Sequence, residues 1–256
     1  MRVYVLTQED AFYIPRLLDQ LLGARRDVVA IGVVPGELRA AHARRYWRLM
    51  GPRAFTLQLA NLVAHRALGL AGRLLPLRRS YSVRDAARRH RVPLEPVPAV
   101  NAPAFVSSLR ARAVNLLVSI ACPQILHRDI LAVPDKGAIN LHGALLPDYR
   151  GLLPSFWVLA NGETHTGATV HYMSERVDQG AVLLQERVPI RDDDTVHTLV
   201  QRTKVEVGGR LLVRAIGLIE QGAPAPRLID PAAGRVFSYP DADAVRRFRA
   251  RGRRFV

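Results

Sequence analysis

The stretch GAINLHGALLPDYRG at Gly137–Gly151, together with VDQG at Val177–Gly180, is the most informative part of the sequence for predicting fold and function. Asn140 and His142 lie two residues apart after an apolar run, so on an extended strand both side chains leave the same face. An amide that donates and an imidazole that can be cationic suit an oxygen that gains negative charge during a reaction. A carboxylate from Asp178 would hold the imidazole in one tautomer and raise its pKa.

Strand-like and helix-like segments alternate on both sides of this stretch. Apolar or β-branched runs, separated by helical patterns, predict strands at 2–7, 28–34, 94–97, 115–119 and 137–141. This alternation predicts a doubly wound, mostly parallel α/β sheet of the Rossmann-like kind. Asn140 and His142 then fall at the carboxyl end of a strand, where ligands of open α/β sheets bind.

The next part of the sequence predicts a strand hairpin and a long helix. Two alternating runs at 166–174 and 181–189 read as strands, with Asp178 in the Gly-containing loop between them. A helical pattern follows from 195 to 221, and Asp194 is its expected N-cap. We interpret the acidic residues before this helix as partners of its dipole and not as metal ligands.

The chain is expected to divide into a large and a small part. A catalytic domain is predicted over 1–222, with an Arg-rich and Leu/Ala-rich helical insert at 38–78. Gly and Pro residues then mark a stop, and 223–256 reads as a basic C-terminal extension. This extension contains an aromatic patch at 236–240 and a short basic helix.

The formal net charge of +15 suggests binding to nucleic acid. The near-exclusive use of arginine over lysine does not favour this interpretation. Among 37 Lys and Arg residues only Lys136 and Lys204 are lysines, and the arginines are scattered along the chain. A surface selected for phosphate usually recruits both, so we expect solvated faces and no nucleic-acid partner. The single cysteine, Cys122, excludes an internal disulfide and a Cys-based zinc site.

No targeting or membrane-spanning segment is predicted. The sequence leads from Met1 directly into a strand-like run, without a signal peptide. The apolar segment Leu57–Leu77 is interrupted by His65, Arg66 and Arg73, so it does not suit a bilayer. The cytoplasm is therefore the default compartment. The same segment and the aromatic patch are candidate contacts in a homo-oligomer.

Several short motifs stand at characteristic spacings from one another over about 115–222. They are Ile139-Asn140-Leu141-His142, Leu145-Leu146-Pro147, Tyr149-Arg150-Gly151, Asn161-Gly162-Glu163, Thr166-Gly167, Val170-His171 and Asp178-Gln179-Gly180. Together they resemble the folate-dependent formyltransferases, which include the glycinamide ribonucleotide, methionyl-tRNA and sugar-amine enzymes. One position departs from the family, which commonly has a Ser two residues after the catalytic His, where this sequence has Ala144. That change bears on local packing more than on charge.

The resemblance implies transfer of a formyl group from N10-formyltetrahydrofolate to an amine, without a metal. By motif position Asn140, His142 and Asp178 are the expected catalytic residues, while His171 is expected to be structural. The expected folate contacts are Ala121, Cys122, Pro123, Gln124, Ile125, Leu126 and Val177. Asn140 and protonated His142 would donate to the formyl oxygen, and Asp178 would keep His142 charged and help to move a proton.

The acceptor is predicted to be a small-molecule amine, in one form a nucleotide-linked amino sugar whose phosphates some arginines would bind. Three alternatives remain open. The first is a 10-formyltetrahydrofolate hydrolase with water as the acceptor. The second is a methionyl-tRNA formyltransferase-like enzyme that lacks the C-terminal barrel, since only 223–256 follow the predicted core. The third is a non-catalytic folate-binding protein.

Overall fold

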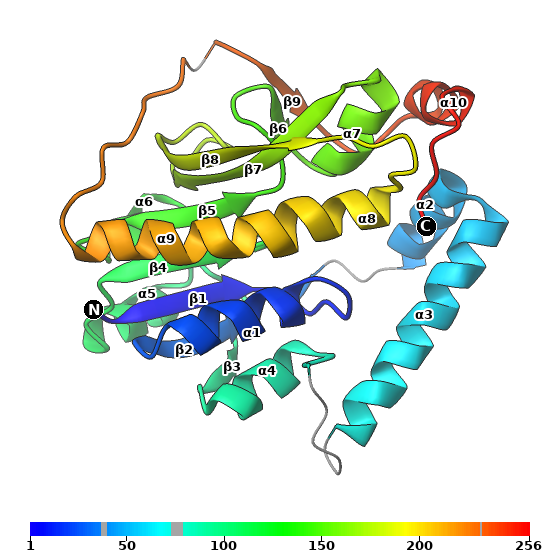
Figure 1. Cartoon of the computed structure of the whole chain (residues 1–256). Helices are drawn as coiled ribbons and strands as arrows, with labels where there is room; N and C mark the ends of the chain where they lie inside the picture. The colour runs from blue at the N-terminus through cyan, green and yellow to red at the C-terminus, as the bar shows by residue number, and fades with distance from the viewer. Residues whose placement is uncertain (37–39, 73–78, 231) are drawn as a thin grey trace.

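The structure, a computed structural model, describes residues 1–36, 40–72, 79–230 and 232–256. Its centre is a seven-stranded sheet in the order β3-β2-β1-β4-β5-β7-β8 (Figure 1). The strands are β1 (Val3–Thr7), β2 (Val28–Val33), β3 (Leu94–Pro96), β4 (Leu116–Ile120), β5 (Ala138–His142), β7 (His165–Tyr172) and β8 (Val182–Pro189). The first five pair in parallel, whereas β7 and β8 are antiparallel at one edge. The predicted doubly wound, mostly parallel α/β sheet is confirmed.

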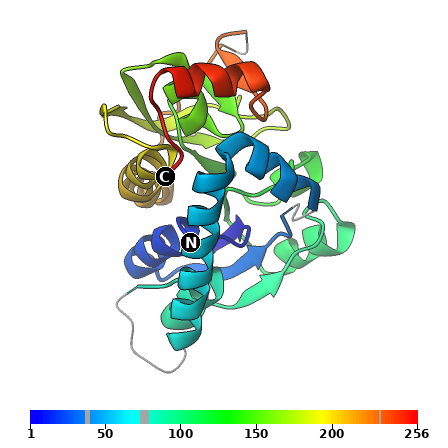
Figure 2. The same ribbon diagram turned by 90° about the vertical axis from the view of Figure 1, so that its right-hand side faces the viewer.

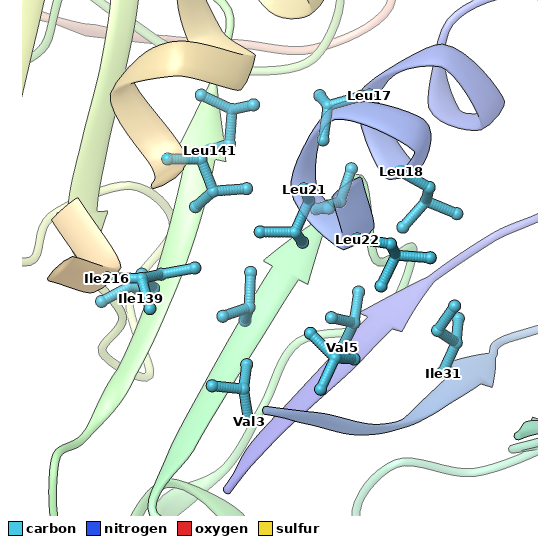
Figure 3. Packing of buried hydrophobic residues seen from close by; sticks show 14 of the residues in the cluster. Val3, Val5, Leu17, Leu18, Leu21, Leu22, Ile31, Ile139, Leu141 and Ile216 are labelled. Atoms are coloured by element: carbon cyan, nitrogen blue, oxygen red, sulfur yellow. The ribbon is translucent and has the colours of Figure 1, made fainter. Parts of the chain in front are cut away.

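Helices cover both faces of this sheet. One face carries α1 (Ile14–Ala24), α4 (Val83–His90) and α9 (Gly208–Glu220), and the other carries α5 (Pro103–Ala111) and α6 (Arg128–Leu131). Figure 3 shows the first layer, where Leu17 and Leu21 of α1 lie in one apolar cluster with Val5 and Ile139. Each of these four side chains is at most 1% exposed. The cluster fixes β5 in the middle of the molecule, with paired neighbours on both sides.

A long helix follows the β7–β8 hairpin. It consists of α8 (Val196–Val200), a π-helical segment η1 (Gln201–Val207) and α9. Its N-cap is Thr195 and not the predicted Asp194. The Thr195 hydroxyl accepts from the Thr198 N–H at 3.1 Å, and the Thr198 hydroxyl accepts from the Thr195 N–H at 2.9 Å. This reciprocal capping box satisfies two N–H groups at once, whereas Asp194 accepts from the backbone N–H of Arg191 outside the helix.

The C-terminal part packs against the motif region. Its elements β9 (Arg235–Phe237) and α10 (Ala242–Ala250) lie against β6 (Tyr149–Gly151) and α7 (Pro154–Asn161) of the motif region. β6 pairs in parallel with β9. The ring centroids of Phe156 and Phe248 are 4.8 Å apart, and those of Phe248 and Phe255 are 4.9 Å apart. The predicted short basic helix is α10, while the boundary at 222 stays a prediction.

The predicted insert contains a helical hairpin of α2 (Ala40–Met50) and α3 (Pro52–Ala71). Residues 38, 39 and 73–78 of that insert lie outside the described residues. Figures 1 and 2 show α3 standing beyond the carboxyl ends of the parallel strands. None of its described side chains is buried. In the described ranges no helix combines the length and apolarity that crossing a membrane requires.

Candidate active site

Asn140 and His142 lie at the carboxyl end of β5 and line one cavity. Asn140 lies opposite Ser119 in the parallel pair with β4, and opposite His171 in the antiparallel pair with β7. Strands on both sides therefore hold the backbone of Asn140. Both side chains reach the same cavity, as their spacing of two residues on a strand predicts.

His171 joins this pair, although the sequence suggested a structural role for it. Its Nδ1 donates to the backbone oxygen of Tyr172 at 2.7 Å. In the neutral ring Nε2 can therefore accept from the amide Nδ2 of Asn140, which lies 3.2 Å away. Nε2 also lies 3.4 Å from Oδ1 of Asp178. The signal that identifies His171 is the register of β5 against β7, which the sequence alone does not reveal.

Asp178 brings a carboxylate against both imidazoles from the loop between β7 and β8. Its Oδ2 accepts from the Gly151 N–H at 2.8 Å and lies 3.5 Å from Nδ1 of His142. Burial acts to raise the pKa of Asp178, but His142, His171 and the Gly151 N–H outweigh it, so the pKa lies well below its ordinary value. The carboxylate is therefore ionised at neutral pH. Asn140, His142, His171 and Asp178 are called the polar cluster below.

Two glycines allow neighbouring backbone segments to come close together and so position Asp178. Gly151 has a φ of 92°, and a Cβ there would lie 2.3 Å from the backbone oxygen of Phe237 in β9. A Cβ at Gly180 would lie 1.8 Å from the backbone oxygen of Tyr172. Neither position has room for a side chain, which explains the glycine at the end of two of the sequence motifs.

The two ring nitrogens of His142 have different partners. Nε2 donates to the backbone oxygen of Tyr149 at 2.6 Å, which leaves Nδ1 facing Asp178. Burial lowers the pKa of His142 by more than Asp178 raises it. Asp178 raises the pKa of His142 as the sequence predicts, but the net pKa is lowered because desolvation of the imidazolium outweighs this one ion pair. For His142 to donate from Nδ1 while Nε2 holds its proton, the ring must be cationic, and burial works against that state.

The cavity joins the polar cluster to the loop predicted to contact the folate. Its volume is about 1690 Å³. Ordinary small-molecule pockets have about 300–1,000 Å³, so this volume suits two ligands side by side. The lining includes every residue predicted for the folate, namely Ala121, Cys122, Pro123, Gln124, Ile125, Leu126 and Val177.

Side-chain hydrogen bonds hold that loop in place. Oε1 of Gln124 accepts from the Val100 N–H at 3.0 Å, and Nε2 donates to the Pro98 oxygen at 2.9 Å. Nδ2 of Asn101 donates to the Ile125 oxygen at 2.8 Å. The loop backbone is thus fixed in advance, which lowers the ordering cost of binding a flat ring against it.

Lys204 of η1 also lines the cavity, and the sequence analysis did not identify it. Its stem passes Gly143, where a Cβ would lie 3.4 Å from Lys204 Cγ. Burial lowers the pKa of Lys204, although Asp10 and Asp178 attract its charge. The same charge contributes to the lowered pKa of His142. The sequence feature that could have identified Lys204 is its rarity, since it is one of two lysines in a chain that otherwise uses arginine.

Ala144 and the acidic triplet Asp192–Asp194 lie outside this chemistry. Ala144 is fully buried, and its backbone oxygen accepts from the Thr169 hydroxyl at 2.7 Å. The missing hydroxyl at 144 is therefore a matter of packing. Among the described residues no group of three or more His, Cys, Asp or Glu side chains is placed to hold a metal ion.

Known proteins with similar sequences are methionyl-tRNA formyltransferases. The protein from Anaeromyxobacter dehalogenans (strain 2CP-C) is 42% identical over 146 residues, which are 57% of this chain and 46% of that protein. The protein from Syntrophus aciditrophicus (strain SB) is 40% identical over 157 residues, 61% of this chain and 49% of the relative. The chain thus spans about half the length of the curated relatives it matches.

Solved structures share the fold at lower identity. Glycinamide ribonucleotide transformylase 1 from Symbiobacterium toebii superposes with a TM-score of 0.59 at 21% identity, over 90% of this chain and 95% of that one. The N-formyltransferase from Helicobacter canadensis, solved with folinic acid and dTDP-3-aminofucose, gives 0.62 at 13% identity, over 97% and 79% of the two chains. The sequence profile described as formyl transferase matches residues 1–216, most of this chain. The chain therefore belongs to the formyl transferase family.

Proposed function

We propose that the protein transfers a formyl group from N10-formyltetrahydrofolate to the primary amine of a small molecule. The observation that carries this proposal is the polar cluster, which gathers an amide, two imidazoles and a carboxylate at the wall of a cavity large enough for two ligands. Family membership supports formyl transfer as the reaction class.

The proposed reaction exchanges one C–N bond for another. The neutral acceptor amine attacks the formyl carbon, the bond from that carbon to N10 breaks, and the products are a formamide and tetrahydrofolate. The amine loses one proton and N10 gains one. While the carbon is attacked, negative charge grows on the formyl oxygen. Asn140 Nδ2 is assigned as its donor, and His142, neutral in the free protein, is assigned as a second donor once it has taken up a proton.

Asp178 is assigned to proton movement. Its carboxylate is ionised and lies against His142 and His171, so it can accept the amine proton directly or through water. His171 is assigned to positioning, because its Nε2 can accept from the Asn140 amide and so holds that amide beside the Asp178 carboxylate. The loop Ala121–Leu126 and Val177 are assigned to the folate, which main-chain groups can read at the edge of its pterin ring.

The identity of the amine is the open part of this proposal. A nucleotide-linked amino sugar is the specific form that the sequence predicts. Its phosphates would need cations, and among the described residues the cavity presents three besides its histidines, namely Arg66, Arg176 and Lys204. The same lining holds four carboxylates, at Glu9, Asp10, Asp85 and Asp178. The net charge of +15 is therefore not concentrated at this site.

Methionyl-tRNA is the second candidate acceptor, and sequence identity favours it. Relatives named as methionyl-tRNA formyltransferases are 40–42% identical to the matched part of this chain. The matched part is about half of each relative, so activity on tRNA does not follow from the match alone.

Release of tetrahydrofolate tests the proposal. The protein is incubated with N10-formyltetrahydrofolate alone, with candidate small amines, and with methionyl-tRNA. Release that depends on a small amine supports the proposal, whereas release only with methionyl-tRNA supports the second candidate. Equal release without any amine identifies a hydrolase. Binding of the folate without release under any condition identifies a non-catalytic protein.

A further inference from the structure

One face of α3 lines the cavity along most of the helix. The lining residues are Phe55, Gln58, Leu59, Leu62, His65, Arg66, Gly69 and Leu70. Successive positions are three residues apart or stand next to each other, as one helical face requires. From Phe55 to Leu70 this face extends about 22 Å at about 1.5 Å per residue. The insert therefore supplies a whole wall of the cavity and not a single contact.

This wall is apolar and open to the cavity. Leu59 is 50% exposed and Leu70 is 57% exposed, and no described side chain of α3 is buried. Phe12 and Tyr81 line the same cavity from outside α3. An apolar body between these surfaces would be covered on more than one side. Each buried methylene contributes about fourfold in affinity.

Contacts near both ends of α3 hold the wall at a distance from the sheet. Near its start, the Trp47 and Phe55 ring centroids are 5.2 Å apart, and Ala54 packs against the aromatic cluster of α7 and α10. Towards its end, the His65 ring lies 5.0 Å from Phe12 and 5.6 Å from Tyr81. Packing contacts therefore maintain the space between α3 and the sheet in the folded protein.

The charges on this side of the cavity disfavour a nucleoside diphosphate. Arg66 is the one cation on the cavity face of α3 among the described residues, and Glu9, Asp10 and Asp85 line the cavity with it. Burial raises the pKa of Glu9, the Arg84 charge acts in the opposite direction, and Asp10 and Asp85 raise it further. Carboxylates repel phosphate but attract an ammonium group, which is the form in which an amine arrives at neutral pH. The ammonium releases one proton to solvent before the neutral amine attacks.

We propose that the cavity face of α3 is the acceptor-binding wall, and that the acceptor is a primary amine joined to an extended alkyl chain. This rests on the proposed function, in which the amine is the second substrate. The folate is assigned to the loop after β4, whereas α3 meets the protein at Phe12, after β1, and at Tyr81. The two ligands therefore have separate walls.

The probes for this proposal are the n-alkylamines from butylamine to octylamine. Their affinity for the protein saturated with 5-formyltetrahydrofolate, a stable isomer of the donor, is measured by calorimetry. Leu59→Gln places an amide on the wall. Leu57→Gln is the matched control, because Leu57 lies two residues earlier, is 57% exposed and is not a lining residue.

In the native protein and in Leu57→Gln we expect affinity to rise about fourfold for each added methylene until the wall is covered. In Leu59→Gln the affinity for octylamine is expected to fall roughly 3- to 10-fold. Affinity that does not change with chain length overturns the proposal, as does an equal loss in Leu57→Gln. A turnover assay with the same amines is read separately. Tight binding of octylamine without transfer of the formyl group to any amine contradicts the proposed function and leaves the wall assignment intact.

Discussion

The polar cluster and the α2–α3 hairpin face the same cavity, but they differ in how firmly the rest of the protein fixes them. Three of the four residues of the cluster lie on paired strands of one sheet and Asp178 lies in the loop between two of them, with contacts of 3.2–3.5 Å within the cluster. α3 has no buried side chain and is held mainly near its two ends. Reaction chemistry depends on fixed positions, which paired strands supply. Choice of acceptor depends on surface chemistry, which a helix outside the sheet can vary without moving the cluster.

The largest expected effect comes from removing the assigned catalytic groups. Asn140→Ala, His142→Ala and Asp178→Ala are each expected to lower the rate of transfer by about 10²–10³ or more, because each removes a group that acts on developing charge or on the proton. Tetrahydrofolate release measures the rate, and circular dichroism checks the fold. Near-normal turnover in His142→Ala would refute the assigned mechanism.

A smaller effect is expected at His171, which acts through its neighbours. His171→Phe removes the acceptor of the Asn140 amide, and a buried donor left without a partner costs about 1–3 kcal/mol, or roughly 5- to 150-fold in rate. We expect kcat to fall while the KM for the amine stays near its native value. The control is His165→Phe, an exposed histidine on the same strand. An equal loss in the control contradicts a positioning role.

Amide hydrogen exchange tests the comparison itself. Backbone amides of β5 are expected to exchange only on global unfolding, whereas those of α3 are expected to exchange at least about 100-fold faster, since local opening of an unburied helix costs little. Mass spectrometry of peptic fragments measures both regions in one sample. Equal protection in α3 and β5 contradicts the view that the hairpin is the less stable region.

The smallest expected effect is a dependence of stability on pH. The pKa values of His142 and His197 are both lowered by burial. The unfolded chain therefore binds protons more readily than the folded protein once the pH falls below about 6.5, so the free energy of unfolding decreases as the solution becomes more acidic. Urea titrations at pH 7.5 and 5.5 should differ by about 1 kcal/mol. The difference should shrink in His142→Asn, and an unchanged difference contradicts burial of a neutral His142.

The sheet could be predicted because its strands are continuous apolar runs, as strands buried on both faces are. The sequence predicts strands at 28–34 and 137–141, and β2 spans Val28–Val33 and β5 spans Ala138–His142. The spacing of Asn140 and His142 predicts that their side chains share a cavity. The expected homo-oligomer stays a prediction.

Two features of the site could not be read from the sequence. The role of His171 depends on which residue of β5 it faces, and register between distant strands is set by the whole sheet. The sequence also does not show which face of α3 lines the cavity. Its sequence is apolar on both sides, with Leu57 and Val63 outside and Leu59 and Leu62 inside, so the pattern predicts a helix without saying which side is covered.

The order of elements around the polar cluster has a consequence for folding. Asn140, His142, His171 and Asp178 come from one contiguous stretch in which β5 pairs with β7 and β7 pairs with β8. Contacts that are close in sequence form quickly, whereas β1 and β4 pair across more than a hundred residues, as in Val3 with Leu116. The cavity is lined from Gln8 to Tyr239, so it needs almost the whole chain. The reacting groups are therefore close in sequence, whereas the place that binds a substrate depends on distant parts of the chain.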